Sequence, residues 1–170
     1  MTPDTPRNPS RKVGLWLIGA FGGVGTTAAI GLSLLTRGKT SSVGMVTALP
    51  LFDGLDLDPA SSFVVGGHDI RAGSFRETAI ELNSRAGLFH PLLIEAARED
   101  LDAWTANVRP GCIVEANPTV AALADPSRVQ VAADASAAVD EIAADLMAFH
   151  ERHKLDQVVV VNVASTEPPY

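Results

Sequence analysis

The chain has 170 residues, 46% of them hydrophobic, and carries a formal net charge of −7 at pH 7. This length predicts one domain over residues 12–170, preceded by a flexible tail at 1–11, a polar stretch with three prolines. The acidic balance argues against a nucleic-acid partner, because affinity for a phosphate backbone depends on Lys and Arg contacts. The single Cys112, expected to be a core thiol, cannot form an internal disulfide or a metal knuckle, and no apolar run approaches membrane-spanning length. We therefore expect a soluble cytoplasmic protein without a metal site.

A strand, a glycine-rich turn and a helix follow one another near the N-terminus. The apolar run Val13–Ile18 predicts a buried strand, and Gly19, Gly22 and Gly25 occupy the first, fourth and seventh places of the turn. Glycines let the backbone turn sharply and approach a pyrophosphate, whose charge is attracted by the free N–H groups of the next helix. The segment therefore predicts dinucleotide binding, with a plain tight turn as the alternative. Gly31, inside the helix, suggests a close-packing requirement.

The remaining chain alternates between apolar strands and helices. The spacing of Ser74 and Glu77 is that of a capping box, which predicts a helix start. A run of valines near the C-terminus predicts a strand buried on both faces, as in a parallel sheet. The expected strands are Val43–Leu49, Phe63–Gly66, Gly111–Glu115, Val129–Ala132 and Gln157–Val163, and the expected helices run from Ser74 to about Arg85, over Pro91–Trp104 and over Ser136–Lys154. This alternation predicts an α/β fold, a Rossmann-like doubly wound parallel sheet.

Three segments follow predicted strands and should line one crevice, because ligands of such sheets bind outside the carboxyl ends of the strands. They are the glycine loop, Gly66–Asp69 and Ala164–Glu167. The acid that holds the adenosine ribose is expected ~20 residues past the glycine loop, where Met45–Thr47 stands instead. Asp69 could supply this carboxylate or be an ordinary turn residue. His68 is expected in the crevice without a catalytic role.

The sequence shows no catalytic base or nucleophile. The glycine loop is similar to that of partition-type ATPases, but those loops need a lysine before the hydroxyl residue, and no lysine lies between Lys12 and Lys39. No Ser-His-Asp or Cys-His spacing indicates nucleophilic catalysis. The catalytic residues therefore stay unknown, and the chain is interpreted as a cofactor holder.

Three motifs together resemble the myo-inositol-1-phosphate synthase family. They are the strand and glycine loop Val13–Thr27, the segment FVVGGHDI at Phe63–Ile70, which is similar to the family's F-V-V-x-G-W-D-I, and VVVNVASTEPPY at Val159–Tyr170, which is similar to its V-x-L-W-T-A-N-T-E-R-Y. The resemblance implies an isomerase that converts glucose 6-phosphate to myo-inositol phosphate with tightly held NAD, by internal redox and aldol cyclisation, for inositol and phospholipid biosynthesis. It also implies a sugar-phosphate substrate and a possible homotetramer.

Carried over by position, the glycines would cradle the pyrophosphate, Asp69 would contact the adenosine side, and the segment after the last strand would approach the nicotinamide. Where the family often carries G-x-G-G-N-N-G, this chain has a phenylalanine, a glycine and a valine in place of a glycine and two asparagines. His68 replaces the tryptophan, Ser165 an asparagine and Pro168 an arginine. The predicted cofactor-binding residues are Gly19, Phe21, Gly22, Gly23, Val24, Gly25, Asp69, Ala164, Ser165 and Thr166.

The family's catalytic lysines and sugar-phosphate contacts lie downstream of the motif that ends this chain. We therefore expect a cofactor-binding domain that lacks the downstream catalytic domain and is inactive alone. Two alternatives stay open. An NAD(P)-dependent oxidoreductase domain would explain the missing ribose acid if Arg37 and Lys39 favour NADP, and a non-enzymatic dinucleotide sensor would explain the shortage of catalytic side chains.

Overall fold

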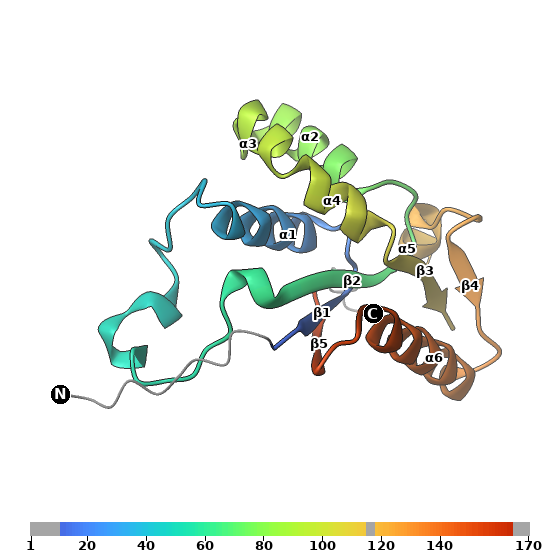
Figure 1. The fold of residues 1–170 in the computed structure, drawn as a ribbon. Helices are drawn as coiled ribbons and strands as arrows, with labels where there is room; N and C mark the ends of the chain where they lie inside the picture. The colour runs from blue at the N-terminus through green and yellow to red at the C-terminus, as the bar shows by residue number, and fades with distance from the viewer. Residues whose placement is uncertain (1–10, 115–117, 165–170) are drawn as a thin grey trace.

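The structure is a computed structural model that describes residues 11–114 and 118–164. Its centre is a five-stranded sheet with the order β4-β3-β2-β1-β5, and every paired strand is parallel to its neighbour (Figure 1). The strands are β1 (Val13–Ile18), β2 (Phe63–Asp69), β3 (Val108–Ile113), β4 (Val129–Val131) and β5 (Gln157–Asn162). This confirms the predicted Rossmann-like α/β class.

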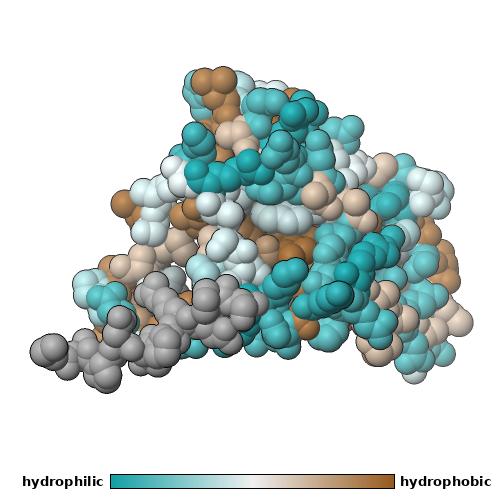
Figure 2. Space-filling model, viewed as in Figure 1, coloured by the Kyte–Doolittle hydropathy of each residue, from teal (hydrophilic) through white to brown (hydrophobic). Residues whose placement is uncertain are grey.

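Helices cover both faces of the sheet. On one face lie α1 (Gly23–Thr36), α2 (Phe75–Ala86), α3 (Pro91–Ala96) and α4 (Arg98–Thr105), and on the other lies α6 (Ala135–His153), while α5 (Pro118–Leu123) follows β3 (Figure 1). Leu17 and Val65 point into the core under α1–α4, whereas Trp16 packs with Phe149 and Leu155 under α6. Alternate residues of a strand face opposite sides, so each buried strand serves both cores. Figure 2 shows hydrophilic residues over much of α4 and α6, with hydrophobic residues visible between these layers.

Side chains cap the starts of two helices, and the cap at Ser74 is the one that the sequence predicts. The Ser74 hydroxyl accepts the Glu77 amide at the start of α2, and Gly87 ends that helix in the left-handed conformation. The Asp134 carboxylate accepts the Ala137 amide at the start of α6, and the last turn of this helix contains His150, Arg152 and His153. These contacts satisfy amides and carbonyls that a helix leaves unpaired at its ends.

The predicted strand Val43–Leu49 is wrong. This segment lies in the crossover from α1 to β2, which contains three short 3-10 helices, η1 (Val46–Ala48), η2 (Pro50–Phe52) and η3 (Ala60–Ser62). Val43 is 89% exposed and Gly44 has a φ of +91°, which interrupts an extended conformation. Both sides of β1 are already paired, with β2 and with β5, so the sheet has no place beside β1 for this segment.

Three further predictions change in detail. The helix expected over Pro91–Trp104 is two helices, α3 and α4, because the buried Ala97 leaves the regular helical conformation with φ −90° and ψ −5°. The strand β5 is at the sheet edge and mostly exposed, so its valines are not buried on both faces. Cys112 is only partly buried and is not a core thiol.

Within residues 11–114 and 118–164, none of the helices has the length and hydropathy of a membrane span.

Candidate functional site

The glycine loop begins directly after β1 and is held by the end of β2. The amides of Gly19 and Ala20 both donate to the carbonyl oxygen of His68, at 2.9 and 3.1 Å. Gly19 has a φ of +86°, and a Cβ on it would lie 2.7 Å from the Ala164 Cα. Only glycine combines this conformation with so close an approach. The loop is therefore fixed against the ends of both strands that flank β1.

The loop leads directly into α1, and the first amides of this helix have no side-chain cap. Gly22 is the N-cap and has no side chain to accept a hydrogen bond, and the first turn contains no acid. Val24, in that turn, is 65% exposed. A helix start of this kind presents N–H groups and the positive end of the helix dipole to an anion. Gly22, Gly23, Val24 and Gly25 form this helix start, the predicted phosphate cradle, and the binding of a phosphate by them stays a prediction.

Gly25 brings α1 close to the loop that precedes it. A Cβ at this position would lie 2.5 Å from the Ala20 carbonyl oxygen and 3.2 Å from that of Gly19. A Cβ at Gly31 would meet nothing within 4 Å, so the close packing expected there is wrong. The requirement for glycine in α1 is concentrated at its first turn.

Asp69, which ends β2, holds the glycine loop through its carboxylate. Its Oδ2 accepts the Phe21 amide at 2.7 Å and its Oδ1 accepts the Arg71 amide at 2.9 Å, and the residue is 5% exposed. The Arg71 guanidinium also lies 3.5 Å from Oδ1 through Nε, and Nη2 donates to the Phe21 carbonyl oxygen. Asp69 and Arg71 together occupy both backbone groups of Phe21.

The position of Asp69 explains why no acid follows the glycine loop at the usual distance. Because Val43–Leu49 is not a strand, Phe63–Asp69 is the second strand of the sheet and lies directly beside β1. Its carboxyl end is where a Rossmann fold places the ribose-binding acid. Asp69 therefore stands where this fold is expected to place such an acid, and its contact with a ribose stays a prediction. Sequence reasoning missed Arg71, although a cation two residues after that acid was a readable signal.

The third crevice segment reaches the loop through its first residues. The Val163 amide donates to the Ile18 carbonyl oxygen at 2.9 Å, and the Ala164 amide donates to Asn162 Oδ1 at 3.1 Å. Together with the approach of Ala164 to Gly19, this places the ends of β1, β2 and β5 at one edge of the sheet. Ser165 and Thr166, the other predicted cofactor contacts of this segment, lie outside the described residues.

Two predicted side chains point away from this edge. The Phe21 ring is buried in the core and packs edge-to-face on Phe75, with ring centroids 5.3 Å apart. His68 is 3% exposed on the α6 side of the sheet, so its expected place in the crevice is wrong for the side chain. Its Nδ1 accepts the Trp16 indole N–H at 3.0 Å, so the neutral ring carries its proton on Nε2, 3.0 Å from Asp145 Oδ2. Burial lowers the pKa of His68, against the opposing effect of Asp145.

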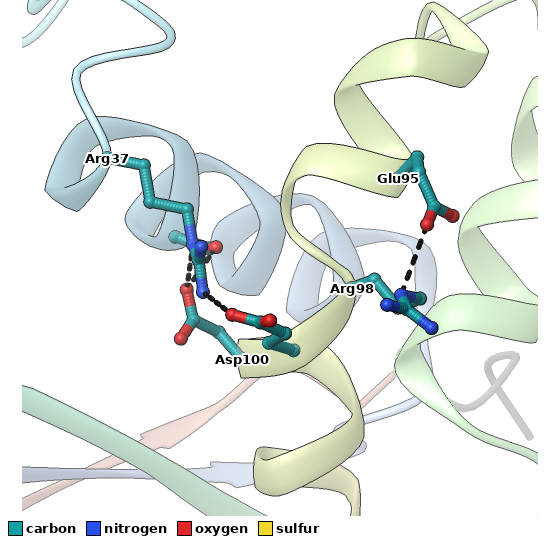
Figure 3. A network of polar contacts seen from close by, with 6 residues as sticks. Arg37, Glu95, Arg98 and Asp100 are labelled. Atoms are coloured by element: carbon teal, nitrogen blue, oxygen red, sulfur yellow. Dashed lines mark hydrogen bonds and ion pairs between the residues drawn. The ribbon is translucent and has the colours of Figure 1, made fainter.

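Arg37 lies at the end of α1 opposite to the glycine loop and contacts acidic residues of α4. It follows the last turn of α1, and its guanidinium donates to Asp100 at 2.8 Å and to Glu99 at 3.2 Å (Figure 3). The Ser33 hydroxyl donates to the same Asp100 oxygen. The Arg37 hydrogen bond is the main reason that the pKa of Asp100 is lowered. This network fixes α1 on α4 at the end opposite to the cradle, which argues against the suggested selection of NADP by Arg37.

Comparisons with known proteins agree with this geometry. A family model described as myo-inositol-1-phosphate synthase, whose name designates an NAD-binding domain, matches residues 13–170. This chain belongs to the myo-inositol-1-phosphate synthase family. Its fold is similar to a crystal structure of inositol-3-phosphate synthase from Caenorhabditis elegans, with a TM-score of 0.73 and 22% sequence identity. That match covers 92% of this chain and 35% of the other, so the chain spans about a third of the length of that protein. Among curated protein sequences, none matches significantly.

The residues of this family member fit a dinucleotide. The uncapped first turn of α1 offers donors to a pyrophosphate, and the absence of an acid from that turn leaves no competing anion there. A Cβ at Gly22 would lie 3.0 Å from the Gly19 carbonyl oxygen, so side chains are kept out of the cradle. The backbone N–H and carbonyl of Phe21 and the carboxylate of Asp69 already have hydrogen-bond partners within the protein. The contacts of these two residues with a cofactor stay predictions.

Proposed function

We propose that this chain is the NAD-binding part of an isomerase that converts glucose 6-phosphate to myo-inositol phosphate. The observation that carries the proposal is the meeting of three strand ends at the uncapped start of α1, in a chain of the inositol-phosphate synthase family. A doubly wound sheet binds its nucleotide at this edge. The reaction would supply inositol for phospholipid biosynthesis in the cytoplasm.

The described residues would bind and orient the cofactor. The amides of Gly23, Val24 and Gly25 would donate to the pyrophosphate, while Asp69 keeps the loop in its bound shape through the Phe21 amide. When bound, NAD would take a hydride from one sugar carbon and return it after ring closure, so that no net NADH forms. Prior fixation of the loop matters because a preformed cradle binds without the entropy cost of ordering it.

The groups that move protons and hold the sugar phosphate would come from outside this chain. The described residues include no lysine at the edge of the sheet where the strand ends meet. We therefore propose that the 170 residues act within a longer enzyme, whose downstream domain supplies the catalytic lysines. The family resemblance further suggests our proposal that the active form is a homotetramer.

A charge placed in the first turn of α1 tests the cradle without disturbing the fold. Val24 is exposed, so Val24→Asp should fold normally and even gain about 0.3–1 kcal/mol from the helix dipole. The same carboxylate would repel a pyrophosphate, and NAD affinity measured by calorimetry should fall at least tenfold. Val24→Asn, of equal shape and no charge, is the matched control and should keep most of the affinity. Equal NAD binding by both variants would place the nucleotide elsewhere.

The reaction itself is tested with the full-length protein. Incubation with glucose 6-phosphate and NAD should form inositol phosphate with no net absorbance change at the wavelength of NADH. Net release of NADH would instead support an NAD-dependent oxidoreductase. NAD binding without turnover by a protein that has its downstream domain would support a dinucleotide sensor.

A further inference from the structure

His68, the last residue but one of β2, connects the glycine loop with the α6 side of the sheet. Its carbonyl oxygen accepts the amides of Gly19 and Ala20, at 2.9 and 3.1 Å. Its ring is buried on the α6 side, with 3% of the residue exposed. The next residue, Asp69, accepts the Phe21 amide. The backbone of the loop is therefore held by the end of β2, and the His68 ring in turn holds the end of β2.

The ring is fixed by a buried hydrogen bond with Trp16 of β1. A Cβ at Gly66 would lie 2.9 Å from the Trp16 ring, so the indole packs on β2 where no side chain stands. Trp16 is 0% exposed, and its N–H donates to His68 Nδ1 at 3.0 Å. Because a buried N–H that loses its acceptor costs free energy, Nδ1 has to stay unprotonated for the two rings to keep this contact. The family motif has a tryptophan in place of His68, and an indole has no nitrogen that accepts, so the accepting nitrogen comes with the histidine of this chain.

The charged groups around the ring come from α6 and β3. Asp145 of α6 lies 3.0 Å from Nε2 and favours a charged ring, but 31% of its side chain is exposed, so solvent weakens this attraction. Arg109, the partner of His68 in the register of β3, opposes a second positive charge. Glu141, one turn before Asp145 on α6, accepts the thiol of Cys112 on β3. Burial has the largest effect and lowers the pKa of His68, so the ring is neutral in the folded protein at pH 7.

We propose that His68 is a positioning residue of the nucleotide site and that its neutral ring keeps the glycine loop in the shape that binds NAD. The proposal rests on the nucleotide site of the proposed function. A proton on Nδ1 turns the acceptor into a donor that faces the Trp16 N–H, while Nε2 keeps its contact with Asp145. The ring then moves away from Trp16, and the carbonyl group that holds Gly19 and Ala20 moves with it. Because NAD binds the form with the neutral ring, its affinity falls as the solution is acidified.

The test is calorimetry of NAD binding to the full-length protein from pH 8 to pH 5, at pH values where circular dichroism shows that each variant is folded. Wild-type affinity should fall about 3-fold to 10-fold over this range, the effect of one net hydrogen bond. His68→Gln keeps an acceptor and a donor but binds no proton, so its affinity should match wild type at pH 8 and stay constant. Trp16→Phe removes the N–H that opposes the proton, so its affinity should also be independent of pH, whatever its level. His153→Gln is the matched control, because His153 lies on α6 and contacts Asn107, and it should keep the wild-type fall.

The outcomes separate this inference from the proposed function. If folded wild type binds NAD equally well at pH 8 and pH 5, the inference is overturned while the nucleotide site stands. A fall in affinity that persists in His68→Gln also overturns it, because another group then titrates. The same holds if His68→Gln changes only the stability, which is the result of a purely structural role. If NAD does not bind at any pH, the nucleotide site itself fails, and the inference fails with it.

Discussion

The packing of α1 on its own glycine loop predicts opposite effects for one substitution at two positions of the helix. At Gly25, an added Cβ would lie 2.5 Å from the Ala20 carbonyl oxygen, 3.1 Å from the Ala20 carbonyl carbon and 3.2 Å from the Gly19 carbonyl oxygen. All three atoms belong to the backbone and cannot rotate away. Gly25→Ala therefore has to move the start of α1 or the loop after β1.

The cost of this movement is that of overpacking, about 1–3 kcal/mol in the free energy of unfolding. For a chain of 170 residues, this corresponds to a fall in melting temperature of roughly 2–12 °C. At Gly31, an added methyl meets nothing within 4 Å and alanine costs less backbone entropy, so Gly31→Ala should stabilise by about 0.5–1 kcal/mol.

Urea unfolding followed by circular dichroism, together with NAD calorimetry, measures both effects. Gly25→Ala should lose stability and NAD affinity together, because the shifted helix start no longer closes the cradle. Gly31→Ala should gain stability and keep its affinity. A Gly25→Ala variant as stable as Gly31→Ala would refute the close contact between α1 and the loop on which the site is built.

Three further predictions concern other described residues. Burial lowers the pKa of His68, so the stability that neutral His68 contributes is present above the unfolded-state pKa of ~6.5 and is lost as pH falls through the folded-state pKa. The free energy of unfolding, measured with urea from pH 8 to 5, should fall with pH for this reason, and His68→Gln should reduce this dependence. Lys154 ends α6 with a φ of 52°, a conformation that glycine adopts at lower cost than lysine, so Lys154→Gly should raise the free energy of unfolding by about 1 kcal/mol. A gain in stability with Lys154→Ala would contradict this reason. Burial and Glu141 raise the pKa of Cys112 to about 11, so thiol reagents should react slowly with it at pH 8. A fast reaction whose rate does not change in Glu141→Gln would contradict this prediction.

Local signals in the chain were enough to predict the elements that build the cradle. The apolar run of β1, the glycines after it, the Ser74 cap and the charge order of α6 each act within a few residues, so they can be interpreted without knowing the neighbours. The motifs around Gly19 and Asp69 likewise indicated the family before any contact was known. Short-range hydrogen bonding and side-chain periodicity explain why these predictions hold.

The features that sequence reasoning missed depend on partners far away in the chain. Val43–Leu49 has the composition of a strand, yet β2 and β5 already occupy both sides of β1. Arg37 is a free cation in the sequence and a partner of Asp100 in the fold, 63 residues away. The Asp69 carboxylate accepts the Phe21 amide, 48 residues away, and Arg71 donates to the Phe21 carbonyl oxygen, 50 residues away. Which groups stay free for a ligand is decided by long-range packing, because a buried polar group takes whatever partner the completed fold brings within reach.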